Sequence, residues 1–360
     1  MNTHTRVSGR SGRRGFTLVE LAAVSATLGA GALVAIPLKG PMEASGLKAR
    51  AANLHREIAS YQLMYINDNE GAFTGPNTSG LAWNRQPQKG FTNPGIETLA
   101  FETGGGEPTS QGDWLTPLVG DVHGFSANRA VRMQQKYDVV ADPFASAPLD
   151  DLFGTDSVED GFQFEKILAS SGYRQMSYLM MRSFTHLPVG TQSSDPFFDA
   201  GTDTFYVERF GVQNSNAPAL IPDGYTPDIF NVGTQPANKA MFADGTRFLS
   251  DGTLDIDVSI FDAMFNNDGS TGPIDDGSVA YGRNPPSGGD GGNLELSFRK
   301  AGGKVLFVSM FDGSLRSMTR EQAWTDPTPW YPSGSAWTGS DATPESIEWV
   351  ETNLPGGIIP

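Results

Sequence analysis

The chain has 360 residues, with 41 acidic against 25 basic side chains, 43 glycines, 24 prolines and no cysteine. The formal net charge of −16 argues against a broad electrostatic attraction to nucleic acid or to an anionic membrane surface. The lack of cysteine excludes disulfides, thiolate metal sites and cysteine nucleophiles.

The chain begins with a basic segment followed by an apolar one. Residues 1–15 carry four arginines and no acid, and Phe16 to Ile36 is almost entirely apolar. As a helix, residues 16–36 would be about 32 Å long, enough to cross a bilayer core of about 30 Å. Only Lys39 follows closely. The positive-inside rule therefore predicts that the N-terminus is cytoplasmic and that the remaining chain is exported.

One carboxylate interrupts the apolar segment. Glu20 costs about 2.5–3.5 kcal/mol inside a bilayer by the mildest insertion scales, and no Lys, Arg or His occurs from Phe16 to Leu38. Glu20 therefore either lies among the cytoplasmic headgroups, in contact with water, or pairs with a positive charge on another copy of the chain.

The stretch Arg13–Glu20, RRGFTLVE, resembles the processing site of type IV pilins and of type II secretion pseudopilins. In that family a prepilin peptidase cuts after the residue that matches Gly15 and methylates the new amino terminus, here Phe16. The resemblance implies that Glu20 pairs with the amine of a neighbouring Phe16 as subunits stack. It also implies partners: the peptidase, other copies or other pilin subunits, and the inner-membrane assembly machinery.

An ordinary secretory signal would be cleaved after the apolar region. The nearest candidate site, Met42–Ser45, lacks a small residue at the upstream position and has Glu43 beside the cut. We therefore expect the segment to stay attached. The alternative function is that of an exported binding protein or enzyme that uses residues 16–36 as a plain anchor.

An amphipathic helix is predicted over residues 47–67. Its apolar stripe recurs at spacings of four and three, and it consists of Leu47, Ala51, Leu54, Ile58, Tyr61 and Tyr65. We expect the stripe to pack on the protein's own head rather than to form a coiled coil. The helix should end near Asn67–Gly71, and glycines and prolines between Gly29 and Gly46 predict a kink or a melted turn there.

The remaining chain, residues 71–360, is predicted to be an exported β-rich head. Residues 72–120 have the composition of turns, residues 128–137 and 160–170 are predicted helices, and residues 173–184 and 205–212 are predicted strands. Together with the N-terminal helix, these elements predict an α+β, pilin-like fold in which the helix packs on an antiparallel sheet with long loop insertions.

Two stretches echo each other. Residues 239–246 and 304–314 are each an apolar run that reaches Asp-Gly, at Asp244–Gly245 and Asp312–Gly313, and each predicts a β-hairpin. The second stretch resembles the C-terminal segment of large-headed pilin-like proteins of planctomycetes. Those proteins usually have a histidine where this chain has Gly302.

Few residues suggest chemistry. The histidines after residue 36, His55, His123 and His186, have no metal-ligand spacing, no GxSxG occurs, and His55 is expected at a solvated or interfacial position. Residues 266–277 are expected to form an acidic turn, with a calcium loop as the alternative. We therefore expect no enzyme, no cofactor and no nucleic-acid partner.

The sequence thus predicts a cleaved cytoplasmic leader, residues 1–15, an N-terminal helix, residues 16–70, and the head. The expected function is that of a structural filament subunit. It would be held first in the inner membrane by a single span and later placed in a periplasmic or cell-surface filament. Pilus and secretion pseudopilus stay open as alternatives.

Overall fold

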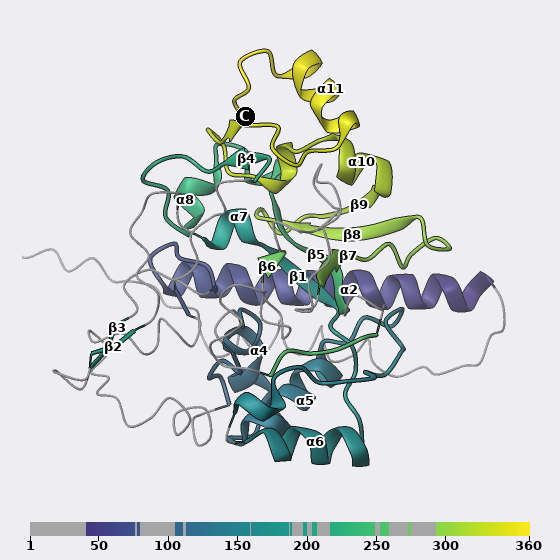
Figure 1. Ribbon diagram of the computed structural model, residues 1–360. Coiled ribbons are helices and arrows are strands. Elements are labelled where there is room, and N and C mark those ends of the chain that lie inside the picture. Colours follow the sequence, from purple (N-terminus) through teal and green to yellow (C-terminus); the bar gives the residue numbers. More distant parts are fainter. Residues whose placement is uncertain are drawn as a thin grey trace, which may run out of the picture. The chain divides into compact units, whose positions relative to one another are not determined.

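The computed structural model describes residues 41–75, 78–79, 105–110, 113–158, 160–186, 188, 197–199, 204–206, 217–248, 253–258, 273–274 and 293–360 (Figure 1). The chain divides into two compact units, residues 1–45 and 46–360. Gly15, Phe16, Glu20 and the predicted span 16–36 lie outside the described residues. Among the helices that are described, none has the length and hydropathy to cross a membrane.

Helix α2, Pro41–Asp68, is the first described element. The predicted end near Asn67 is confirmed: the amide of Gly71 donates to the carbonyl of Ile66, 2.9 Å, and Gly71 has φ +97°, which favours glycine. Residues 41–46, Gly46 included, are helical. The kink predicted between Gly29 and Gly46 is therefore absent from this last part, and the rest of that interval lies outside the described residues.

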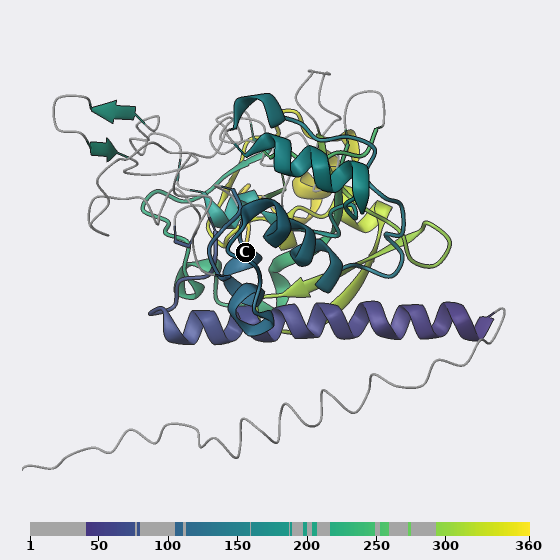
Figure 2. The same ribbon diagram turned by 90° about the horizontal axis from the view of Figure 1, so that it is seen from below.

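The predicted packing of α2 on the head is confirmed, but the buried face of the helix is shifted relative to the predicted stripe. The buried side chains recur at each helical turn along a single face: Ala51, His55, Ile58 with Ala59, Gln62 and Ile66. Leu54, Tyr61 and Tyr65 of the predicted stripe are only half-buried and flank that face. Figure 2 shows α2 along one edge of the head, with the other elements on one side of it.

The central sheet has the order β6-β1-β5-β8-β9, and β7 pairs with β5. All pairings are antiparallel except β1 with β6. The strands are β1 Tyr178–Met181, β5 Ala240–Phe248, β6 Pro273–Ile274, β7 Asn293–Leu296, β8 Val305–Met310 and β9 Leu315–Thr319. Buried residues of β1, β5 and β8 form one apolar core together with Ile58 and Ile66 of α2. The α+β class is confirmed.

The hairpin at Asp312–Gly313 is confirmed, and the hairpin at Asp244–Gly245 is wrong. Gly313, with φ +82°, lies in the turn between β8 and β9. Asp244 and Gly245 instead lie inside β5, because β1 pairs with its first half and β7 with its second half. A Cβ on Gly245 would lie 2.2 Å from Leu179, so glycine is needed there for close strand packing.

The two echoing stretches are therefore neighbours in the sheet. In the antiparallel pair of β5 and β8, Phe242 lies opposite Ser309 and Ala243 opposite Val308. Asp244, one position further along β5, thus lies close to β8 in the middle of the sheet.

Two predicted helices are confirmed as α5, Arg129–Val139, and α6, Gly161–Ser170. Asn128 caps α5 by accepting from the amide of Val131, 3.1 Å. The prediction for residues 173–184 is right only for β1, since residues 182–185 form a helix. Of residues 205–212, only the end of β3 is described.

The predicted loop 72–120 contains the start of helix α4, Thr116–His123, so that part of the prediction is wrong. In Figure 1, α4, α5 and α6 gather at one end and α10 and α11 at the other. The remaining elements are α7 Arg182–Thr185, β2 Phe197–Asp199, β3 Thr204–Tyr206, β4 Ala219–Leu220, α8 Ile229–Val232, α10 Arg320–Thr325, β10 Ala336–Trp337 and α11 Pro344–Asn353, with short 3-10 turns at Thr155–Ser157, Pro236–Asn238 and Thr328–Trp330.

Candidate functional site at the junction of helix and sheet

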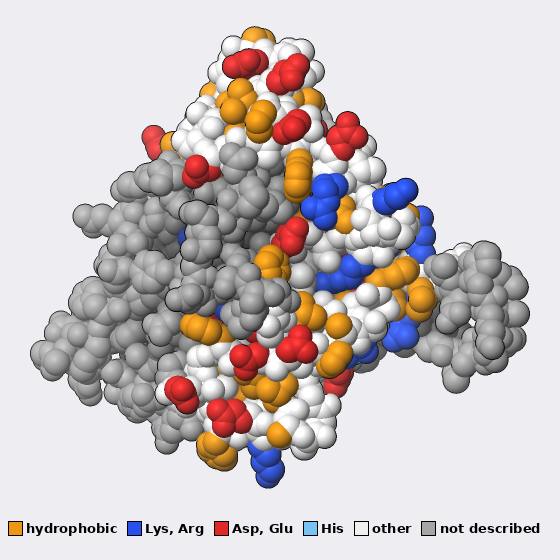
Figure 3. All heavy atoms as spheres, turned by 45° about the vertical axis from the view of Figure 1, so that its right-hand side comes forward, with side chains coloured by type: hydrophobic (Ala, Val, Ile, Leu, Met, Phe, Trp, Pro, Cys, Tyr) orange, Lys and Arg blue, Asp and Glu red, His pale blue; other side chains and the backbone are white. Residues whose placement is uncertain are grey.

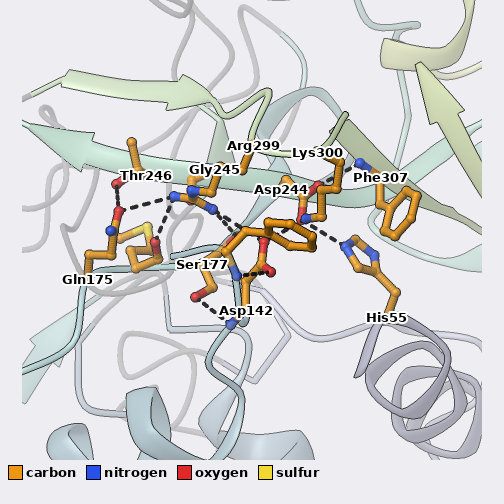
Figure 4. Close-up of polar contacts among 12 residues, drawn as sticks. His55, Asp142, Gln175, Ser177, Asp244, Gly245, Thr246, Arg299, Lys300 and Phe307 are labelled. Carbon is orange, nitrogen blue, oxygen red and sulfur yellow. Dashed lines mark hydrogen bonds and ion pairs between the residues drawn. The ribbon is translucent and has the colours of Figure 1, made fainter. Parts of the chain in front are cut away.

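A buried polar cluster joins α2 to the sheet (Figure 4). Its ionisable members are two carboxylates, two basic side chains and one imidazole, which come from α2, from the segment after α5, from β5 and from the segment between β7 and β8. They are His55, Asp142, Asp244, Arg299 and Lys300. We call them the junction cluster.

Asp244 is the centre of the junction cluster. Its Oδ1 lies 3.0 Å from Nε2 of His55 and also contacts Nζ of Lys300, and its Oδ2 accepts from the amide of Phe307, 2.6 Å. Burial alone would raise the pKa of Asp244, but the hydrogen bond and charge of His55 and the charge of Lys300 lower it to about 2. Asp244 is therefore ionised at neutral pH.

His55 is completely buried, so the solvated position predicted as one alternative is wrong, and the side chain lies at the interface of α2 and the sheet. Position 55 follows Ala51 by four residues and precedes Ile58 by three, which places it on the inward face of α2. Its Nδ1 lies 2.9 Å from Oγ of Ser309, and its ring stacks on Phe242 with centroids 5.2 Å apart. Since ionised Asp244 can only accept, Nε2 carries a proton; Nδ1 accepts from the Ser309 hydroxyl when the ring is neutral and donates to it when the ring is charged.

Lys300 links Asp244 to the second carboxylate. Its ammonium donates to Oδ2 of Asp142, 2.6 Å. Neighbouring Arg299 lies 3.8 Å from the same oxygen and donates to the carbonyl of Gly245, 2.9 Å. Asp142 also accepts from the amide of Phe144, 3.0 Å. Both carboxylates thus have several donors, which is the condition under which buried charges are tolerated.

The order Ser309, His55, Asp244 has the composition of a hydrolase triad. However, His55 and Asp244 are 0 % exposed and Ser309 is 1 % exposed. The Ser309 hydroxyl is therefore enclosed by the core, and Asp244 is also engaged by Lys300 and by the backbone of β8. This arrangement fixes where α2 lies on the sheet, and it does not present a nucleophile to solvent.

A second buried ion pair stabilises the helical end of the head. The guanidinium of Arg129 donates to both carboxylate oxygens of Asp160, 2.6 and 2.8 Å, and to the carbonyls of Thr109 and Val258. This pair ties α5 to the start of α6 and to two distant segments. All of its donors point into the protein, so we assign it a structural role.

No group of three or more metal-ligating side chains occurs within the part of the chain that the structure describes. His186 is buried, and burial lowers its pKa well below the ordinary value. The ring of His123 lies 6.5 Å from that of Tyr61, centroid to centroid. The acidic turn or calcium loop predicted at residues 266–277 lies outside the described residues, apart from the strand Pro273–Ile274.

Sequence reasoning named His55 but missed its partners. Asp142, Lys300 and Ser309 are separated from His55 by long stretches of chain, and no local motif connects them. One signal was available: a helical position that continues a buried stripe but carries histidine requires a buried polar partner.

The comparisons with known proteins gave no match, whether against protein-family models, curated proteins or solved structures.

Proposed function

We propose that the chain is a structural subunit of a type IV pilus-like or type II secretion pseudopilus filament. In this proposal a prepilin peptidase cuts after Gly15, and the mature chain assembles through its N-terminal helix. The observation that carries it is the stretch RRGFTLVE at the start of an apolar segment, with a charged Glu20 that has no partner in that segment.

The organisation of α2 supports the proposal. One face of the helix is buried against an α+β head, and the opposite face, with Asn53, Arg56, Ser60 and Met64, is exposed. Met64, on this exposed face, is 54 % exposed. A subunit of this kind keeps a free helix face for its neighbours.

The junction cluster supports a structural role as well. A filament subunit must hold its head at a fixed angle to the helix that enters the filament. Buried ion pairs contribute more to a unique arrangement than to net stability in several known systems. His55 and Asp244 would fix both the rotation and the axial position of α2.

The experiment is mass spectrometry of the chain produced in cells that contain a prepilin peptidase. We expect the mature protein to begin with N-methylated Phe16. Gly15→Leu should leave the uncut precursor in the membrane, and the matched leader variant Gly9→Leu should be processed normally. A chain that begins near Ser45, or one left uncut in cells that process a known prepilin, would contradict the proposal and favour a plain anchor.

A further inference from the structure

A basic patch lies where the head meets the chain that leads to residues 16–36. From Ala44 to Arg56 the sequence contains Lys48, Arg50 and Arg56 and no acid. Lys304, in the loop before β8, lies in a second stretch without acids, residues 297–311. All four side chains are exposed. We call these four residues the basic patch.

Contacts of the junction cluster place the two stretches together. The amide of Lys304 donates to the carbonyl of Lys300, 3.1 Å, and Lys300 shares Asp244 with His55 of α2. Burial raises the pKa of Tyr178, whose ring is 4.9 Å from that of His55, well above its ordinary value, and the charge of Arg50 opposes this shift. Lys304 and the first half of α2 are therefore on the same side of the head.

The patch is unusual in a chain with a net charge of −16. Within the described residues, none of its four members forms an ion pair. In Figure 3, Lys and Arg gather on the right-hand part of the view, and Asp and Glu gather mainly toward its top and bottom. Exposed positive charge from Lys48, Arg50 and Arg56 thus lies on the first half of α2.

We propose that the basic patch docks the head onto anionic phospholipid headgroups while residues 16–36 are held in the bilayer. This inference rests on the proposed function, because that function supplies the span. The residues between Ile36 and Lys48 extend to at most about 40 Å, so Lys48 stays within that distance of the bilayer edge in any conformation. Part of this stretch, residues 41–47, is helical, which shortens the reach further.

The covalent link to residues 16–36 favours lipid over a second copy of the chain as the partner of the basic patch. The chain holds the patch beside the membrane from the moment of insertion, at a high effective concentration. Each basic side chain near an anionic surface contributes about 1 kcal/mol, or about a fivefold shift in the docking equilibrium. The overall negative charge of the chain argues against a broad attraction to an anionic membrane. A local attraction between the basic patch and the headgroups is still expected, because screening confines each charge interaction to about 8–10 Å.

The test uses the full chain in vesicles of phosphatidylcholine, alone or mixed with phosphatidylglycerol. Because the chain has no cysteine, Ala301→Cys beside Lys304 and Thr352→Cys on α11 each give a unique site for a fluorophore. A quencher attached to the headgroups of the head-side leaflet then reports docking. We expect stronger quenching at position 301 in the anionic vesicles only, no such change at position 352, and loss of the difference at about 1 M salt.

Charge variants sharpen the test. Lys304→Gln should lower the docked-to-free ratio about fivefold and Lys48→Gln/Lys304→Gln about 25-fold, and Lys166→Gln on α6 should leave it unchanged. Equal quenching in both lipids, for a chain that resists alkaline extraction, overturns this inference and leaves the filament proposal intact. Quenching that follows protein density rather than lipid charge also overturns it and assigns the patch to a second copy. A chain that is extracted from the vesicles refutes the span and therefore both proposals.

Discussion

Asp244→Asn is the substitution that tests the junction cluster most sharply. The carboxylate accepts from three donors on α2, on the segment before β8 and on β8 itself: His55 Nε2, Lys300 Nζ and the amide of Phe307. An amide has only one acceptor oxygen. Its NH2 group would therefore face one of these donors, and the positive charge of Lys300 would keep only Asp142 as a close carboxylate partner.

The expected loss can be worked from the structure. The pKa of Asp244 is lowered from its ordinary value of 3.8 to about 2, which corresponds to about 2 kcal/mol of stabilisation at neutral pH. Breaking a buried pair from one side costs about 3–5 kcal/mol, because the remaining charge loses its partner. We therefore expect Asp244→Asn to lower the free energy of unfolding by about 2–5 kcal/mol, a large part of the 5–15 kcal/mol typical of a domain.

The assay is urea unfolding of the full chain in detergent, followed by hydrogen exchange of residues 47–67. The matched control is Asp223→Asn, also an Asp before a glycine but exposed, which should change the stability by less than about 0.5 kcal/mol. Because the folded pKa lies below the unfolded one, the contribution of Asp244 is fully present above about pH 5 and is lost as the pH falls toward 2. If Asp244→Asn unfolds like Asp223→Asn, and α2 exchanges no faster, the junction cluster does not hold the helix.

Two glycines in regular elements should respond in opposite directions. Gly245→Ala places a Cβ 2.2 Å from Leu179 and should lower the stability by about 1–3 kcal/mol. The Cβ of Gly46→Ala meets nothing within 4 Å, so this substitution should raise the stability by about 0.5–1 kcal/mol. Thermal unfolding of both variants checks this, and equal effects would contradict it. A chain starting at Lys48 keeps the buried face of α2 and should fold. A chain starting at Gly71 exposes the core that Ile58, Ala59 and Ile66 cover. Because burial of each large apolar side chain contributes about 1.5–3 kcal/mol to stability, this shorter chain should melt much earlier or aggregate. Equal melting temperatures of the two chains would show that α2 does not stabilise the head.

Local signals predicted the elements that local chemistry decides. The apolar stripe of α2, the helix predicted over residues 128–137 and the turn at Asp312–Gly313 all rest on residues close together in the sequence. Asp244–Gly245 has the same local turn signal as Asp312–Gly313, but pairing with β1 and β7 places it inside strand β5. The outcome there depends on partners from distant parts of the chain, and a turn propensity cannot report them.

The junction cluster could not be predicted from the sequence for the same reason: its members come from distant parts of the chain. The sequence predicts a solvated or interfacial position for His55 from its place on an amphipathic helix, and its three-dimensional surroundings come from β5, β8 and the segment before β8. The sequence supplied the predicted processing site in full, by resemblance. Gly15, Phe16 and Glu20 stay predictions, because they lie outside the described residues.

The measurement that tests the filament proposal most directly is co-assembly of Glu20→Ala with the unmodified chain. The substitution removes a charge from the predicted span, so membrane insertion should become easier, and incorporation into filaments should fall because the amine of a neighbouring Phe16 loses its counter-charge. Tagged, processed Glu20→Ala and tagged wild type would be compared in sheared filament fractions, with Ser25→Ala as the control within the same segment. The account predicts normal processing and depleted incorporation for Glu20→Ala alone. Incorporation equal to wild type would contradict the pairing between subunits and leave Glu20 as a solvated residue of a membrane anchor.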